Sequence, residues 1–164
     1  MSLDTLKDLY IDQLQDLYSA DRQARAVVKE MCETATDPQL RDALNRGING
    51  IEDGMQALKS LIEGHKADPT GEFCKGMEGL ATEARKHAVK MEFGADEVRD
   101  ASIITQYQRM AHYAIAGYGT ALAFARRLEL KGDVDTLQAC LDATYHGDGE
   151  MSAIAEGHVN HKAA

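Results

Sequence analysis

Tryptophan is absent from this 164-residue chain, which also contains only two prolines and three phenylalanines. Few aromatic residues and few β-branched runs disfavour a β-sheet, and the rarity of proline permits long helices. The length suits one domain with a single core and is too short to divide comfortably into two. We therefore expect residues 1–164 to form one all-α domain.

Paired cysteines, long apolar runs and basic clusters are also missing. Cys32, Cys74 and Cys140 stand apart without a Cys-x-x-Cys pair, so neither a disulfide framework nor a zinc knuckle is indicated. No apolar run reaches the roughly 18 residues of a membrane helix, and the N-terminus lacks a secretory-signal pattern. The net charge is −9 and no basic stripe is present. These absences predict a cytoplasmic protein that binds neither membranes nor nucleic acid.

What the chain does contain is helical periodicity, with apolar and small residues recurring every three or four positions. Glycine, proline and polar clusters divide these periodic segments. The predicted helices run from Ser2–Asp4 to Thr34, from Pro38 to Glu63, from Lys75 to Met91 with an interruption at Gly79, from Glu97 to Leu130, and, after a break at Lys131–Asp133, from Val134 to Gly157. The pattern thus predicts four long helices and a short one in the connection between the second and third.

The second and fourth of these helices carry the most specific local signals. Asp37 is expected to cap the second helix, with Pro38 at its first position. Further along the same helix, Gly47, Gly50 and Gly54 each cost about 1 kcal/mol relative to alanine, so small side chains must be required there. The helix Glu97–Leu130 has a predicted buried stripe of Val98, Ala101, Ile104, Ala111, Ile115, Tyr118, Leu122 and Ala125.

Several short sequence segments resemble the corresponding segments of one protein family. They are Asp8-Leu9-Tyr10 and Leu17–Gln23, the segment Cys74-x-x-Met77-Glu78-Gly79-Leu80, and Val98-Arg99-Asp100 together with Gln108–Gly119. Over about Leu6–Ala155 the chain resembles the YciE/YciF family of bacterial ferritin-like proteins. The resemblance implies a ferritin-like four-helix bundle with the short helix in the crossover between long helices two and three. It also implies a stress-associated role and a homodimer.

The family pattern places carboxylate and imidazole ligands for two metal ions on the four long helices, as in other ferritin-like carboxylate proteins. This chain keeps the acid of the first helix as Asp21. The other positions are emptied: Gly47, Asn49 and Gly50 in the second helix, Ala111 and Ala114 in the long helix, and Ala143 and Thr144 in the last. Too few oxygen donors remain for two divalent ions, so no metal and no other cofactor is expected.

Three functional hypotheses remain open. The preferred one is a non-enzymatic structural or interaction protein that has kept the scaffold and lost the di-metal site. The second is a metal-dependent oxidase or peroxide-handling protein with a rebuilt iron or manganese site of Asp21, His112, His146 and Asp148. The third is a small-ligand binder, which requires a cavity beside Gly50, Ala111, Ala114 and Ala143 instead of a packed seam. The residues themselves do not decide between seam and cavity.

The remaining histidines and tyrosines have simpler explanations than metal or redox chemistry. His146, His158 and His161 suit a nitrogen-rich metal patch, but a frayed polar C-terminal tail is the preferred interpretation. The tyrosines near the former centre are interpreted as helix-packing residues with hydrogen-bonded hydroxyls. They are Tyr107, Tyr113, Tyr118 and Tyr145.

Overall fold

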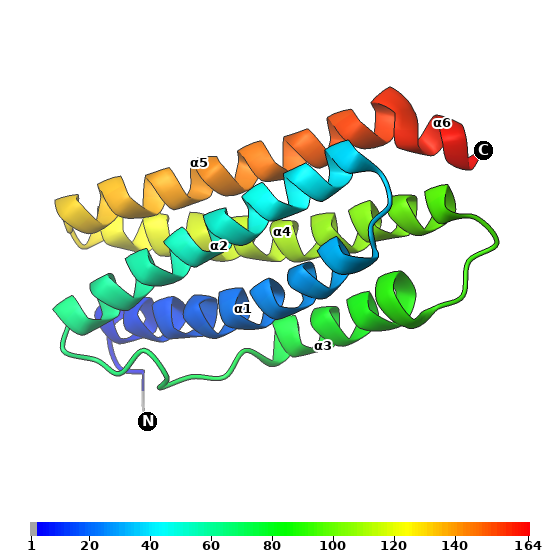
Figure 1. Cartoon of the computed structure of the whole chain (residues 1–164). Helices are drawn as coiled ribbons and strands as arrows, with labels where there is room; N and C mark the ends of the chain where they lie inside the picture. Colours follow the sequence, from blue (N-terminus) through cyan, green and yellow to red (C-terminus); the bar gives the residue numbers. More distant parts are fainter. Residues whose placement is uncertain (1–2) are drawn as a thin grey trace.

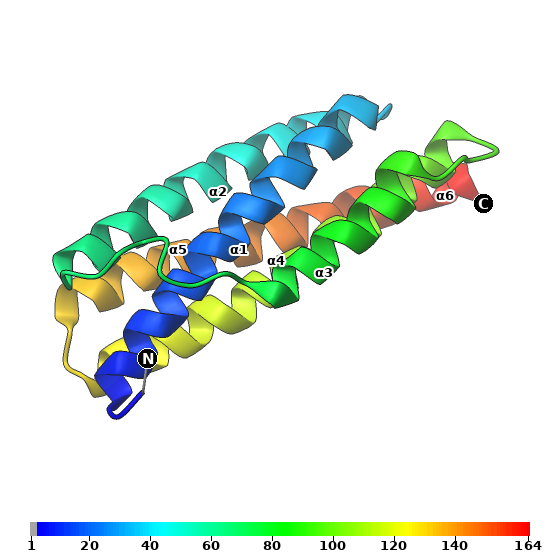
Figure 2. The same ribbon diagram turned by 90° about the horizontal axis from the view of Figure 1, so that it is seen from below.

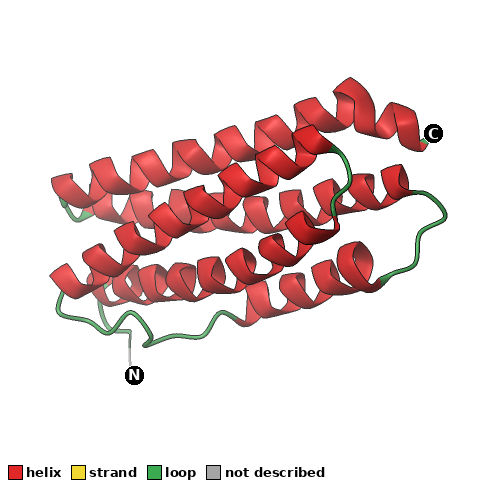
Figure 3. Cartoon of the chain, in the orientation of Figure 1, coloured by secondary structure: helices red, strands yellow, loops and turns green. Residues whose placement is uncertain are grey.

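The computed structural model describes residues 3–164, and within that range the regular structure is entirely helical (Figures 1 and 3). The elements are α1 (Leu6–Thr34), α2 (Pro38–Gly64), α3 (Lys75–Ala84), the π-helical turn η1 (Arg85–Lys90), α4 (Asp96–Arg127), α5 (Lys131–Ile154), the π-helical turn η2 (Ala155–Val159) and α6 (Asn160–Ala163). The predicted all-α bundle of four long helices, with a short helix between the second and third, is confirmed.

The first two helices begin where local capping chemistry places them. Thr5 and Asp8 form a capping box, in which the Thr5 side chain accepts from the Asp8 amide and the Asp8 carboxylate accepts from the Thr5 amide. Helix α1 therefore begins at Leu6, later than the predicted Ser2–Asp4, of which Ser2 lies outside the described residues. Asp37 caps α2 through the Leu40 amide, as predicted.

Two predicted breaks are wrong. Gly79 lies inside α3 without interrupting it, because the helix continues as one rod into η1. The turn between α4 and α5 falls before the predicted Lys131–Asp133, since α4 ends at Arg127 and α5 already begins at Lys131. Glu129 makes this turn with a positive φ of 59°, so the left-handed residue is not the nearby glycine.

Two antiparallel hairpins, α1–α2 and α4–α5, form the bundle, and α3 packs on α1 and α4 (Figure 2). Tyr10, Leu14 and Leu58 are fully buried near one end of the bundle, and Met31, Leu44 and Ile103 near the other. Val98 is exposed, although the periodicity of α4 placed it in the buried stripe. It lies in the first turn of α4, on the side of the helix that faces away from the buried Asp100.

Long-range polar contacts hold the end of the bundle where α1 turns into α2. Asp100 of α4 is buried and accepts hydrogen bonds from the Thr36 amide at 2.9 Å, the Thr36 hydroxyl at 2.7 Å and the Asp37 amide at 2.8 Å. His158 of η2 lies 2.8 Å from the Asp37 carboxylate, and Val159 is buried beside it. The C-terminal segment is therefore docked, and the predicted frayed tail is wrong.

Candidate functional site: a cavity in the bundle centre

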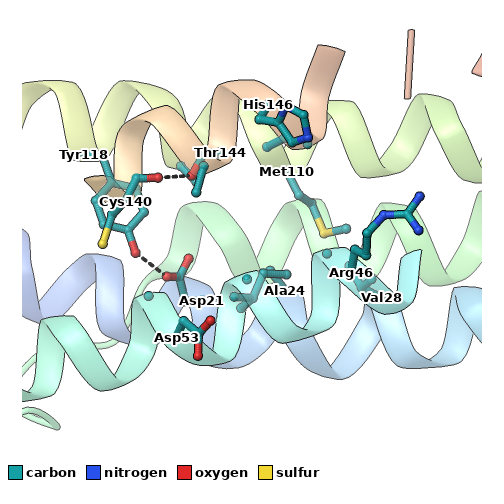
Figure 4. A pocket seen from close by; sticks show the side chains of 18 of the residues that line it. Asp21, Ala24, Val28, Arg46, Asp53, Met110, Tyr118, Cys140, Thr144 and His146 are labelled. Carbon is teal, nitrogen blue, oxygen red and sulfur yellow. Dashed lines mark hydrogen bonds between the residues drawn. The ribbon is translucent and has the colours of Figure 1, made fainter. Parts of the chain in front are cut away.

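A cavity of about 460 Å³ lies between the two hairpins, in the middle of the bundle (Figure 4). Its lining comes from α1, α2, α4 and α5, with Met77 contributed by α3. The walls consist mainly of small and apolar residues: Ala24, Val28, Ala43, Gly47, Gly50, Ile51, Gly54, Ala57, Met110, Ala111, Ala114, Ala139, Ala143 and Gly147. The bundle centre therefore contains a cavity and not a packed seam, which were the two alternatives that the sequence left open.

Most of the emptied ligand positions face this cavity. Gly47 and Gly50 line it from α2, and a further four line it from the other hairpin: Ala111, Ala114, Ala143 and Thr144. Asn49 does not line it and is exposed on the outer side of α2. A Cβ atom at Gly50 would meet nothing within 4 Å, whereas the space beside Gly47 is taken by the Tyr107 side chain.

Gly54 is a cavity residue that the ligand pattern missed. A Cβ atom at this position would lie 2.8 Å from the Tyr118 hydroxyl and 3.3 Å from Asp21 Oδ2. The spacing of Gly47, Gly50 and Gly54 along one face of α2 did signal a need for small side chains. That need is now explained, because the face of α2 meets tyrosine side chains that cross from α4.

Asp21 is the buried acid of the cavity wall. Its side chain extends from α1, is only 4% exposed, and accepts a hydrogen bond of 2.6 Å at Oδ2 from the Tyr118 hydroxyl (Figure 4). Burial raises the pKa of Asp21 to about 7, although the hydrogen bond from Tyr118 lowers it. Within residues 3–164 no second hydrogen bond reaches this carboxyl group. Near neutral pH, Asp21 therefore exists in both its neutral and its ionised forms.

Tyr107 places a second buried polar group at the cavity. Its side chain is 8% exposed, and its hydroxyl lies close to the backbone of Gly47 and Gly147, where no side chains intervene. Burial raises the pKa of Tyr107 to about 12, helped by the charges of Glu150 and Asp148. No hydrogen bond to this hydroxyl is made by the part of the chain that the structure describes. The hydroxyl therefore remains available at the cavity wall.

The other tyrosines differ from this arrangement. Tyr118 is packed and hydrogen-bonded as expected. The Tyr113 hydroxyl lies outside the cavity, 3.2 Å from Asp16 Oδ2 and 2.9 Å from Cys74 Sγ. Tyr145 is 55% exposed and points away from the bundle centre. Packing with a bonded hydroxyl thus describes Tyr113 and Tyr118 but not Tyr107 or Tyr145.

Charged side chains gather at the rim of the cavity, where α2 faces α5. Arg46 of α2 forms an ion pair with Glu150 of α5 across this gap. Asp53 and His146 also border the cavity and are exposed. The cavity consequently has an apolar interior with Asp21 inside and a charged rim open to solvent.

Cys140 contributes a thiol group to the cavity lining. Burial raises its pKa to about 11, and the nearby carboxylates of Asp21 and Asp53 add to this effect. A thiol with a raised pKa is a weak nucleophile at neutral pH. Cys140 therefore behaves as a small apolar wall residue.

The four residues of the rebuilt metal-site hypothesis do not come together. His112 Nε2 lies 3.0 Å from Asp148 Oδ2 in a pair outside the cavity, and Gln108 also contacts Asp148. Asp21 and His146 both line the cavity but at different levels, as Figure 4 shows. Asp21 lies near Cys140, because its charge raises the pKa of that thiol. His146 follows Cys140 by almost two helical turns, which places it roughly 9 Å farther along α5. Asp21 and His146 are therefore separated along the bundle.

The donor set of the bundle centre does not fit two divalent metal ions. Such ions require several oxygen or imidazole donors directed at one point. Across residues 3–164, no group of three or more His, Cys, Asp or Glu side chains is arranged to hold a metal ion. The C-terminal histidines do not supply one either, since His158 is bonded to Asp37 and lies away from His146. The described side chains of the bundle centre therefore do not fit a di-metal site.

Comparison with known proteins agrees with this architecture. The family described as "Domain of unknown function (DUF892)" matches residues 5–164. Protein YciF of Escherichia coli strain K12 is 27% identical over 164 residues, covering 99% of this chain and 98% of that protein. The crystal structure of the E. coli stress protein YciF superposes with a TM-score of 0.89 at 26% identity, covering 96% of this chain and 99% of that one.

A second solved structure, YcfI from Rhodopseudomonas palustris, gives a TM-score of 0.85 at 28% identity and covers 93% of this chain and 97% of that one. None of the helices described here is long and apolar enough to pass through a bilayer. The family match and the full-length likeness to YciF together confirm the resemblance read from the local strings. This chain belongs to the DUF892 family, to which the YciE/YciF resemblance pointed.

Proposed function

We propose that this protein is a non-enzymatic, stress-associated member of its family that binds a small, mostly apolar molecule in the bundle centre, in place of a di-metal site. The observation that carries the proposal is the cavity of about 460 Å³ bordered by the emptied positions. Cavities of roughly 300–1,000 Å³ with apolar walls and a few polar groups are typical of small-molecule sites. The stress association rests on the likeness to the E. coli stress protein YciF.

Two further features favour ligand binding over a purely structural role. An apolar space of this size forgoes packing contacts, which would destabilise a bundle that had no use for it. The glycines of α2 also lower helix propensity while keeping the space open. The cost of the empty space, and that of Gly50, where no neighbour requires a glycine, are explained if a ligand occupies the cavity.

The test is binding of the neutral dye N-phenylnaphthylamine to the full chain, followed by fluorescence. We expect saturable binding of about one dye per chain with a micromolar Kd, since an apolar pocket of this size buries most of such a ligand. The double variant Gly50→Leu/Ala143→Leu fills the cavity from opposite hairpins and is expected to weaken binding by roughly tenfold or more. A Cβ atom at Gly50 meets nothing within 4 Å, so a side chain has room to leave the helix at this position.

The matched control is Gly79→Leu/Ala123→Leu, which makes the same two changes on exposed helix positions outside the cavity. It is expected to bind the dye like the unmodified chain. Dye binding that is absent, or that is unchanged in the cavity-filled variant, would contradict the proposal.

We propose a cytoplasmic homodimer that does not bind nucleic acid. The net charge of −9 supports the exclusion of nucleic acid, and the exposed Tyr145 on α5 supports self-association. Light scattering should give twice the 17.9 kDa mass of one chain, and the mass of one chain would contradict the dimer.

A further inference from the structure

The interior of the central cavity offers a surface for a hydrocarbon body. Ala24, Val28, Ile51, Met110 and Ala114 all line it, and they come from three different helices. Apolar groups that leave water for such a surface gain free energy in proportion to the area buried. The polar groups inside the cavity must therefore select among apolar ligands.

Asp21 and Tyr107 provide that selection, because both retain hydrogen-bonding capacity. A carboxylate has about four acceptor sites, and Asp21 receives one hydrogen bond, from Tyr118. The Tyr107 hydroxyl makes no hydrogen bond with any residue of the described range, although its side chain is more than nine-tenths buried. Both groups can therefore form a hydrogen bond with a polar group that enters the cavity.

The charges around the cavity define the sign of that partner. Glu150 is paired with Arg46 at the rim. Asp21 and Asp53 line the cavity and form no ion pair with the other residues of 3–164. The cavity therefore has uncompensated negative charge, which attracts a cation and repels an anion such as a fatty acid.

We propose that the cavity binds a small organic amine, whose ammonium group donates hydrogen bonds to the Asp21 carboxylate and whose hydrocarbon body lies against the apolar wall. The inference rests on the proposed ligand-binding function and adds the chemical class of the ligand. A hydrogen bond between ammonium and carboxylate is charge-assisted, and it is stronger than one made by a neutral hydroxyl. The ligand cation also compensates a carboxylate that would otherwise be buried unpaired.

The experiment compares three probes with the same six-carbon chain and different head groups: hexylamine, hexanol and hexanoate. Each displaces N-phenylnaphthylamine from the full chain at about pH 8 in the presence of EDTA, which removes metal ions that an amine could coordinate. At this pH the amine is a cation and the acid an anion. We expect hexylamine to displace the dye at a concentration roughly tenfold lower than hexanol, and hexanoate to be weaker than hexanol.

The variant Asp21→Asn tests the assigned anchor. We expect it to reduce the advantage of hexylamine over hexanol to about twofold or less, with hexanol itself little changed, because the apolar wall is intact. Asp135→Asn removes the same charge from an exposed position of α5 outside the cavity and should keep the full advantage. Hexanol binding in Asp21→Asn shows that the variant is folded.

The two proposals fail in different ways. If the dye binds but hexylamine and hexanol compete equally, or if Asp21→Asn keeps the advantage of hexylamine, the amine proposal is overturned and the ligand-binding function stands. If neither the dye nor any of the three probes binds, as measured directly by calorimetry, both proposals are overturned.

Discussion

Replacing Asp21 by asparagine is expected to raise the free energy of unfolding at pH 8 by about 2–4 kcal/mol. Burial raises the pKa of this carboxyl from 3.8 to about 7, and each pKa unit corresponds to about 1.4 kcal/mol. The native state therefore prefers the neutral carboxyl, and its stability falls as the pH rises from 3.8 towards 7. Asparagine has no such charge, and its side-chain oxygen can still accept the hydrogen bond of Tyr118.

Urea unfolding at two pH values measures this effect. We expect the gain in Asp21→Asn to be full at pH 8 and mostly lost at about pH 4.5, where the carboxyl of the native chain is protonated. Asp135→Asn, at an exposed position, should change stability by less than about 0.5 kcal/mol at either pH. A variant that is equally stable to the unmodified chain at both pH values would show that Asp21 is not a buried, destabilising charge.

The opposite result is expected for Asp100, whose replacement by alanine should lower the free energy of unfolding by about 3–5 kcal/mol. Asp100 receives three hydrogen bonds from the α1–α2 turn, two of them from the backbone amides of Thr36 and Asp37. Hydrogen bonds to a charged group contribute about 1.5–3 kcal/mol each, and the two backbone amides would lose their acceptor. Since one of these amides belongs to the cap of α2, the start of that helix would loosen as well.

Asp96→Ala is the control for this substitution. Asp96 lies one turn earlier on α4, is mostly exposed, and pairs only with Arg99. Its loss should cost less than about 1 kcal/mol in the same denaturant series. Similar effects at Asp96 and Asp100 would mean that the contacts with the α1–α2 turn contribute little to stability.

The fold was predictable from the sequence wherever local chemistry determined it. Asp37 and Pro38 set the start of α2, and the three- to four-residue periodicity gave the number and approximate length of the helices. The errors occurred where distant parts of the chain decide the outcome. The C-terminal segment is ordered because His158 contacts Asp37, and no local sequence pattern predicts a contact between residues so far apart in the chain.

The candidate site was predictable as a set of small residues but not as a shape. Gly50, Ala111, Ala114 and Ala143 were expected to line the former metal centre, and they do line the cavity. Whether helices close such a gap depends on the large residues around it, and here the hydroxyls of Tyr107 and Tyr118 lie against Gly47 and Gly54 of α2. Asn49 was wrongly expected to face the bundle centre, because the family's ligand pattern identifies the helix that carries a ligand but not the side of that helix that faces inward.

We propose that a ligand cavity has replaced a di-metal centre in this protein, and the metal content of the purified protein tests this replacement most directly. The full chain would be expressed in medium supplemented with iron and manganese, purified without chelator, and subjected to elemental analysis. We expect total iron and manganese far below one ion per chain, because no group of three or more metal-binding side chains converges within residues 3–164. Two ions per chain, the occupancy of an intact di-metal carboxylate site, would contradict this account.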